Sequence, residues 1–220
     1  VATLLCAIPS RTPADRLGRT LLALQAEATV DSDAVVAAAE EALRLGDHGL
    51  AERLARGALN HGEHFGARLT LSSALAWQGR GREADSVLAA VELGGLSEEQ
   101  LMAWALPRAA NQFWMLSEPE RATTFLQNIR GRLSEASSHS TLDALSATFS
   151  MNAGNVRRAV EMAATVLDRP DAPDMAVAWA GSATALCSAR MGRFDAVGPA
   201  ASAAGGGGRD RARAPGRQQA

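Results

Sequence analysis

Small and hydrophobic residues return along the chain at near-constant intervals, and the segments between them have the composition of helices that come in pairs. We predict helix pairs over residues 31–59, 63–93, 97–133, 140–168 and 172–204. The breaks between first and second helices lie near Gly46, Gly79, Ser117, Gly154 and Gly192. Glycine tolerates a positive φ at the C-terminus of a helix, so the chain can reverse direction at these points.

An alanine follows each break and repeats along the chain. These alanines are Ala51, Ala84, Ala122, Ala159 and Ala196, at steps of 33, 38, 37 and 37 residues. The residue twelve positions before each alanine is also small: Ala39, Ser72, Ala110, Ala147 and Thr184. Two helices approach closely only where side chains are small, and one pair cannot bury its own apolar face. The pattern therefore predicts a stack of helix pairs.

Start signals support several of these helices. The segments Ser97–Gln100 and Ser117–Glu120 match the capping box, in which a hydroxyl and a carboxylate or amide satisfy free backbone amides. The segments 12–13 and 171–173 place a capping residue and an early proline at helix entries. Residues 137–140 are predicted to form a polar loop before the next helix. Pro107 should kink the helix that contains it, or else a short helix ends at Leu106.

We predict an all-α fold: a right-handed superhelical stack of antiparallel helix pairs. Residues 1–30 are predicted to be the remnant of a preceding pair, with a helix over 14–27 and the end of another over 1–8. Residues 31–204 form the repeat domain, and residues 205–220 form a disordered tail rich in glycine and arginine. The start at Val1, in the middle of a repeat, indicates a fragment of a longer protein.

Composition narrows the possible functions. The chain of 220 residues is 47% hydrophobic, has 4% aromatic residues and no tyrosine, and is rich in alanine, leucine, glutamate and arginine, which favours helices over strands. Its net charge of −2 includes a tail with four arginines and one aspartate, so the body is acidic and is not expected to bind nucleic acid. The longest apolar run, residues 2–8, is too short to cross a membrane. Two distant cysteines and no export signal favour the cytoplasm.

The spacing from Gly46 to Ala51 and then to Ala58 and Leu59, repeated from Gly154 to Ala159, resembles the tetratricopeptide repeat. The period here exceeds the 34 residues of that family, and most of its aromatic positions are unfilled. The repeats are rich in arginine and alanine and have turns such as GRGREA at residues 79–84. In these features they are similar to the helical region of large bacterial LuxR-type regulators of the MalT kind. In that family an ATP-binding domain precedes the repeats and a helix-turn-helix follows them, and the sequence contains neither motif. The resemblance implies a role in sensing an effector or partner.

The sequence contains no convincing catalytic or metal-binding set. His61, Glu63 and His64 could share one helix face, but zinc needs three or four ligands, and these residues look more like polar residues at a helix entry. The glycines at 205–208 have neither the strand before them nor the lysine after them that a phosphate-binding loop needs. We therefore predict a protein that is not an enzyme and that carries no metal and no cofactor.

The candidate binding residues come from the tetratricopeptide numbering, in which first helices line a concave groove. The residues predicted to lie there are Trp77, Trp104, Asn111, Trp114, Met115, Met151 and Asn152. Indole rings offer broad apolar contact and asparagines offer matched donors and acceptors, which suits a peptide, a protein segment or a small effector. The alternative is that these tryptophans fill space between layers, as we expect for Trp179.

The function favoured by the sequence is therefore a non-enzymatic binding and sensing scaffold, part of a bacterial transcriptional regulator. Its predicted ligand is an effector or protein partner in the groove. A structural linker or interaction module with no small-molecule ligand is the alternative, and a helical enzyme is a third possibility for which we find no convergent ionisable groups.

Overall fold

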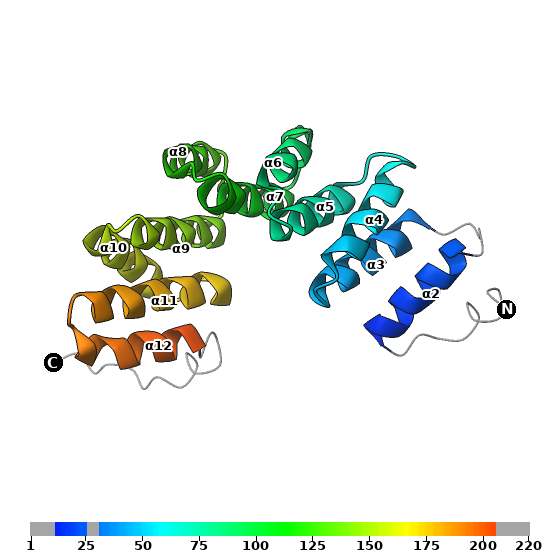
Figure 1. Ribbon diagram of the computed structural model, residues 1–220. Helices are drawn as coiled ribbons and strands as arrows, with labels where there is room; N and C mark the ends of the chain where they lie inside the picture. Colours follow the sequence, from blue (N-terminus) through cyan, green and yellow to red (C-terminus); the bar gives the residue numbers. More distant parts are fainter. Residues whose placement is uncertain (1–11, 26–30, 206–220) are drawn as a thin grey trace. The chain divides into compact units, whose positions relative to one another are not determined.

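The computed structural model describes residues 12–25 and 31–205, and all regular elements within these ranges are helices (Figure 1). The α-helices are α2 (Pro13–Gln25), α3 (Ser32–Arg44), α4 (His48–Leu59), α5 (Phe65–Trp77), α6 (Gly81–Ala89), α7 (Glu98–Ala110), α8 (Pro119–Arg130), α9 (Ala136–Asn152), α10 (Val156–Leu167), α11 (Asp174–Arg190) and α12 (Val197–Gly205). A π-helix, η1 (Asn111–Met115), follows α7, and a 3₁₀-helix, η2 (Phe194–Ala196), precedes α12. The prediction of an all-α fold is confirmed for this part of the chain.

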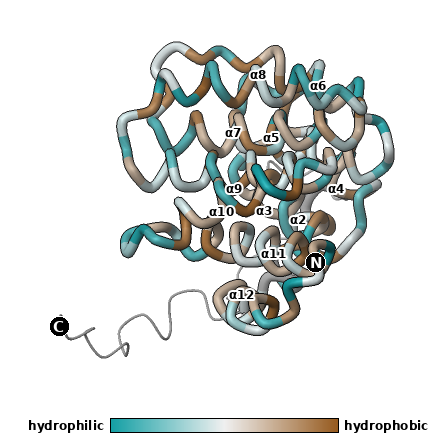
Figure 2. Tube along the Cα trace, turned by 90° about the vertical axis from the view of Figure 1, so that its left-hand side faces the viewer, coloured by the Kyte–Doolittle hydropathy of each residue, from teal (hydrophilic) through white to brown (hydrophobic). Residues whose placement is uncertain are grey.

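Neighbouring helices pack in pairs, among them α3 with α4, α9 with α10 and α11 with α12 (Figure 1). Figure 2 shows hydrophobic and hydrophilic residues along the same helices, as expected where one face of a helix is buried. Helix α2 matches the helix predicted over 14–27, and its Leu17 is buried in the same cluster as residues of α3, α4 and α5. The predictions for residues 1–8 and for the tail beyond Gly205 lie outside the described residues.

The chain divides into two compact units. Unit 1 comprises Val1–Leu96 and Ala110–Ser117, and unit 2 comprises Ser97–Ala109 and Glu118–Ala220. Unit 1 contains the hairpins α3–α4 and α5–α6 together with η1, and unit 2 contains α8 to α12 and most of α7. The prediction that residues 31–204 form one repeat domain stays a prediction.

The turns inside the hairpins share one backbone conformation. The residues at the five predicted breaks all have positive φ: Gly46 (82°), Gly79 (76°), Ser117 (56°), Gly154 (84°) and Gly192 (73°). The residue after each break has φ between −83° and −114° and ψ between 51° and 75°. At the four glycine turns its N–H donates to the carbonyl five residues earlier, at 2.9 Å each. This is the Schellman arrangement, so the predicted breaks are confirmed as hairpin turns.

The repeated alanines occupy one environment. Ala51, Ala84, Ala122 and Ala159 are each the fourth residue of their helix and are at most 1% exposed. Ala196 departs from this pattern, because it lies in η2 and is only partly buried. A turn of fixed geometry places the fourth residue of the second helix against the first helix. Only a small side chain fits at such a close crossing.

The long helix of the third pair does not end at Leu106. Helix α7 continues through Pro107 to Ala110, and the chain then forms η1, in which the N–H of Leu116 donates to the carbonyl of Asn111 at 3.0 Å. A π-turn holds one residue more than an α-turn. Residues before η1 are therefore displaced by one position relative to the other first helices, which matters for Trp104 below.

The residues predicted as a loop, Ser137–Ser140, are instead the start of α9. Their N-terminal support comes from Glu98, which is distant in sequence. The Glu98 carboxylate accepts the N–H groups of Ser134 and Glu135 at 2.9 Å each and the Ser134 hydroxyl at 2.7 Å. Hydrogen bonds donated by the Ser134 backbone, above all, lower the pKa of Glu98 to about 2, because they stabilise its charged form.

The capping predictions have mixed outcomes. At Ser97 the box forms, because Gln100 N–H donates to the Ser97 hydroxyl at 3.2 Å and Ser97 N–H donates to the Gln100 side chain at 3.0 Å. At Ser117 the prediction is wrong: this residue is the left-handed turn residue, and Glu118 is the N-cap of α8. The hairpin needs a residue of positive φ there, and this requirement takes precedence over capping.

Replacing Ser117 by glycine should stabilise the protein. A left-handed conformation costs an L-residue about 1–2 kcal/mol, and glycine removes this cost. The greater conformational freedom of glycine in the unfolded chain offsets about half of the stabilisation. We expect the free energy of unfolding, from urea denaturation followed by circular dichroism, to rise by up to about 1 kcal/mol. The reverse substitution Gly154→Ser, at an equivalent turn, should lower it by about 1 kcal/mol. A lower stability for Ser117→Gly would contradict this account of the turn.

Glu98→Gln should weaken the protein in a way that depends on pH. The pKa of Glu98 in the folded protein is about 2, below the ordinary 4.5, so its contribution is complete above pH 4.5 and is lost as pH falls towards 2. The denaturation midpoint of Glu98→Gln should therefore lie below that of the wild type at neutral pH, and the two should converge in acid. Exposed Glu99 supplies the control substitution Glu99→Gln, for which we expect little change at either pH. An equal deficit at all pH values would argue against the charged cap.

Candidate functional site around Trp77

Trp77 is the most prominent exposed aromatic residue of unit 1. It is the last residue of α5 and is 74% exposed. Its ring stacks on that of His48, the first residue of α4, with ring centroids 5.9 Å apart and planes 7° from parallel. An exposed indole offers a broad apolar surface and one N–H donor. The contact with His48 restricts its orientation.

A carboxamide fixes the backbone beside this stack. Gln78 follows Trp77, and its side-chain nitrogen donates to the carbonyl of His48 at 3.2 Å and to a carboxylate oxygen of Glu52 at 2.9 Å. The first contact joins the end of α5 to the start of α4, and the second reaches the next turn of α4. We call the rings of Trp77 and His48 the Trp77 platform. The two hydrogen bonds of Gln78 join the α3–α4 and α5–α6 hairpins beside this platform.

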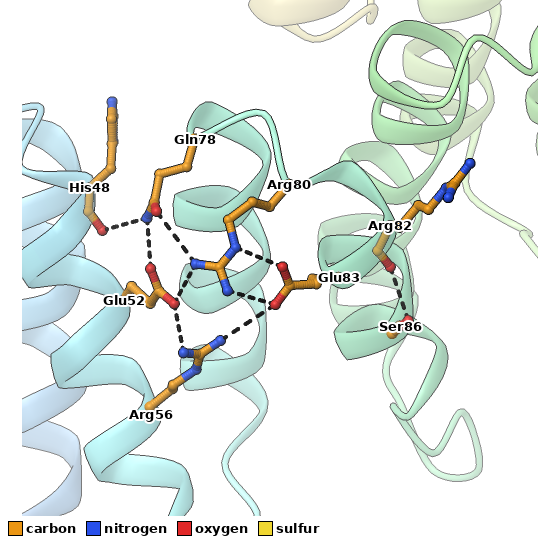
Figure 3. A network of polar contacts seen from close by, with 8 residues as sticks. All are labelled: His48, Glu52, Arg56, Gln78, Arg80, Arg82, Glu83 and Ser86. Atoms are coloured by element: carbon orange, nitrogen blue, oxygen red, sulfur yellow. Dashed lines mark hydrogen bonds and ion pairs between the residues drawn. The ribbon is translucent and has the colours of Figure 1, made fainter.

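Arg80 is the centre of the charged network that continues from Gln78 (Figure 3). Its guanidinium donates two hydrogen bonds to Glu83, at 2.7 and 2.6 Å, and one to Glu52 at 2.7 Å. Arg56 donates to the same Glu52 carboxylate at 2.7 Å and lies 3.8 Å from Glu83. Two arginines and two glutamates thus form a neutral network that links α4 to the turn between α5 and α6.

The network keeps its carboxylates charged. Burial raises the pKa of Glu52, but hydrogen bonds from Gln78 and Arg80 and the charges of Arg56 and Arg80 outweigh it and lower that pKa overall. The hydrogen bonds from Arg80 lower the pKa of Glu83, and those from Glu83 and Glu52 raise the pKa of Arg80. Because every charge has an opposite partner here, the network holds the platform in place rather than selecting a charged ligand.

Asn111 has a structural contact in this unit. It is 4% exposed, and its side-chain nitrogen donates to the carbonyl of Gly81, the first residue of α6, at 2.8 Å. A Cβ atom on Gly81 would lie 2.6 Å from the Cβ of Met115 and 3.2 Å from the side-chain oxygen of Asn111. This close approach explains why glycine opens α6. It also means that the amide of Asn111 binds the protein backbone.

Trp104 is not on a surface in this structure. Predicted to line the groove, it is 2% exposed, packs edge-on against Phe125 at 5.4 Å between centroids, and lies under the guanidinium of Arg108. It precedes Ala122 by 18 residues, whereas the buried residues Ala67 and Leu142 precede their own repeated alanines by 17. The extra residue of the π-turn supplies that one-residue difference, so Trp104 takes the place that Ala67 and Leu142 have in their own helices.

The other predicted binding residues are divided between the two units. In unit 1, Trp114 is 41% exposed and contacts Phe113 edge-on at 5.3 Å, and Met115 is 48% exposed. In unit 2, Met151 is 7% exposed and packs in a cluster with Ala159, Ala183 and Cys187. Asn152 is exposed, and its side chain donates to the carbonyl of Thr148 at 2.8 Å. Trp104, Asn111 and Met151 are thus buried rather than on a surface, and a binding role for the predicted residues stays a prediction.

The histidine pair considered as a metal site has other roles. His64 is the N-cap of α5: its Nδ1 accepts the N–H of Ala67 at 3.3 Å, and its Nε2 lies 2.8 Å from a carboxylate oxygen of Asp33. Glu63 pairs with Arg68 at 2.6 Å. Within residues 12–25 and 31–205, no group of three or more potential ligands is arranged to hold a metal ion. In the same ranges no helix has the length and apolar character needed to cross a membrane.

Fold and site together define an all-α protein of helical hairpins with an exposed aromatic platform at the junction of two hairpins. Comparisons with protein-family models, with curated proteins and with solved structures found no match for the chain.

The sequence predicted that Trp77 lies on a surface, which its exposure confirms, but it did not predict the contacts around it. His48 and Glu52 contact Trp77, Gln78 and Arg80 across 26 to 30 residues of sequence, so no local pattern marks these contacts. One signal was available: Gln78 and Arg80 flank the turn glycine, and two turns of α4 carry Glu52 and Arg56 on one face at i, i+4 spacing.

Removing the arginine at the centre of the network should loosen unit 1. In Arg80→Met, Glu52 keeps Arg56 but loses a charged hydrogen bond, and Glu83 loses two. We expect a lower denaturation midpoint, by less than the loss of a buried ion pair would cause, because solvent screens these partly exposed charges. The matched control is Arg82→Met, because the side chain of Arg82 points away from the network in Figure 3. Equal losses in both variants would mean that the network does not stabilise the hairpin junction.

Proposed function

We propose that this chain is a non-enzymatic helical-repeat scaffold that binds an effector or a protein partner at the Trp77 platform. In this proposal the hairpins follow one another as a right-handed superhelical stack. The shared geometry of the five hairpin turns supports repetition, because it gives the two helices of each hairpin the same relation to one another. The observation that carries the binding proposal is the exposed indole of Trp77, which is held in place by His48 although most of its surface faces solvent.

The platform suits recognition for physical reasons. A large aromatic ring left in water is unfavourable, and one whose orientation is already restricted loses little further entropy when a ligand covers it. The neutral network beneath it holds the backbone of both hairpins. A peptide segment or a small molecule with an apolar or planar group is the ligand class that this arrangement favours.

The parent protein in this proposal is a bacterial LuxR-type transcriptional regulator. The support is the resemblance of the repeats to the helical region of that family, in which such repeats sense an effector or partner. In this chain, the spacing of small residues that carries the resemblance places Ala51 and Ala159 at buried positions. The coding sequence on both sides of the segment tests the parentage: a P-loop upstream and a helix-turn-helix downstream are expected.

A structural linker remains the second candidate, favoured by one observation. Asn111 and Trp104, which belonged to the predicted groove, are both buried and engaged in contacts within the protein. If the chain is a structural linker, Trp77 is exposed but binds no ligand. The two functions differ in whether any ligand contacts that indole.

The binding proposal can be tested by ¹⁹F NMR on the chain labelled with 5-fluorotryptophan. Trp77→Phe assigns the Trp77 signal, and the buried Trp104 supplies an internal control in the same sample. We titrate separated peptide and metabolite fractions of a bacterial extract. At least one fraction should shift the Trp77 signal in a saturable manner and leave that of Trp104 in place. If no fraction moves the Trp77 signal selectively, the linker function is favoured and binding at the platform is rejected.

A further inference from the structure

The chain passes between the two compact units at three places. It leaves unit 1 after Leu96 and enters unit 2 at Ser97, returns to unit 1 between Ala109 and Ala110, and leaves it again after Ser117. The second of these crossings lies inside the continuous helical segment that α7 and η1 form. One helical segment thus belongs to unit 2 over most of its length and to unit 1 at its end.

The first part of this segment is bound to unit 2. Glu98 is the first residue of α7, and its carboxylate accepts the N–H groups of Ser134 and Glu135 at the start of α9, at 2.9 Å each. Further along α7, the buried ring of Trp104 packs edge-on against Phe125 of α8, with ring centroids 5.4 Å apart. These contacts hold α7 against α8 and α9.

The last part of the segment is bound to unit 1. Asn111, the first residue of η1, donates a hydrogen bond from its side chain to the carbonyl of Gly81 in α6 at 2.8 Å. A Cβ atom on Gly81 would lie only 2.6 Å from the Cβ of Met115, so η1 lies very close to the start of α6. Each end of the segment is therefore fixed to its own unit.

Between these two attachments the hydrogen bonding of the helix is irregular. Pro107 has no N–H, so the carbonyl of Ala103 lacks the bond that the residue four positions later would donate in an α-helix. In η1 the N–H of Leu116 donates to the carbonyl of Asn111, five residues earlier, at 3.0 Å. Because proline and π-turns are the usual places where helices bend, bending costs less here than in an unbroken α-helix.

The packing at the same place leaves two polar atoms unsatisfied. The side-chain oxygens of Asn111 and Gln112 are buried and accept no hydrogen bond from the residues that the structure describes. Gln112 is only 2% exposed. A buried acceptor without a donor raises the free energy of the protein. The cost lowers the advantage of this arrangement over one in which water reaches the two oxygens.

The other two crossings also have adaptable backbone. The first follows Gly94 and Gly95, and Gly95 has a φ of 85°. The third follows Ser117, which forms a hairpin turn with a φ of 56°. A change in the relative orientation of two units must be absorbed wherever the chain passes between them. All three crossings lie at or beside backbone that departs from a regular helix.

We propose that residues 107–117 form a hinge about which units 1 and 2 change their relative orientation. A hinge consists of a few residues that absorb a backbone change while the elements on either side stay rigid. The contacts of Glu98 on one side and of Asn111 on the other supply these rigid attachments. The hinge goes beyond the proposed function and does not depend on binding at the Trp77 platform.

The test measures distances in the full chain by pulsed electron paramagnetic resonance. Nitroxide labels are attached to p-acetylphenylalanine in place of the exposed residues Arg53 in α4 and Arg158 in α10, one in each unit. The distance distribution should be at least about twice as broad as that of a reference pair within unit 1, at Arg53 and Arg82. Pro107→Ala should narrow the distribution between the units, because the restored N–H donates to the carbonyl of Ala103 and stiffens the segment.

The matched control is Pro173→Ala, which makes the same substitution at the N-cap of α11, away from the three crossings. It should leave both distributions unchanged. A distribution between the units that is as narrow as the one within unit 1 would overturn the proposal, and so would equal narrowing by Pro107→Ala and Pro173→Ala. A broad distribution that Pro107→Ala leaves unchanged would also overturn it, because the bend would then lie outside this segment.

Discussion

A left-handed residue at the turn of every hairpin is the constraint on which the rest of the structure depends. At Gly46, Gly79, Gly154 and Gly192 the positive φ allows two carbonyls at the helix end to be satisfied within the turn. The residue after the turn then takes nearly the same φ and ψ each time, so the second helix starts in a fixed direction. Ser117 takes the same conformation without being glycine, which shows that the hairpin geometry overrides local preference.

In unit 1, the residue that opens the helix after each glycine turn is contacted by the next hairpin. The carbonyls at the start of α4 and α6 accept amide donors from residues that follow in the next hairpin, Gln78 and Asn111. Each such bond adds only about 0.5–1.5 kcal/mol. Asn111 is buried, so leaving its amide nitrogen without an acceptor would cost more, whereas the exposed Gln78 could bind water instead. Trp77 covers His48, the residue after the N-cap of α4, whereas Phe194, which follows the equivalent residue Arg193, is 74% exposed.

The π-turn at η1 shows how one added residue changes which side chains are available. It lets the first helix of the third pair continue past Pro107 and still reach its hairpin turn at Ser117. Upstream of it, every residue is displaced by one position, which is about 100° around a helix. Trp104 therefore takes the buried position of Ala67 and Leu142 and lies in the core of unit 2 against Phe125.

Much of the architecture could be predicted from local signals. Glycine spacing predicted the turns, and the small residues twelve positions before and at the repeated alanines predicted the close crossings, of which Ala39, Ala51, Ala147 and Ala159 are 0% exposed. The candidate site was less accessible to prediction. Trp77 is exposed as predicted, but its contact with His48 and the contact of Glu52 with Arg80 form only when two hairpins pack. Trp104, Asn111 and Met151 are buried.

The amino-acid sequence by itself determined where the chain reverses and which residues are small enough for helices to meet, because both depend on the backbone freedom and volume of single residues. Only the tertiary structure decided which aromatic side chains are exposed and what supports them. It also decided that the start of α9 is capped by Glu98 rather than by its own serines. Exposure and capping across hairpins depend on groups tens of residues apart, and their meeting is set by packing rather than by any local pattern.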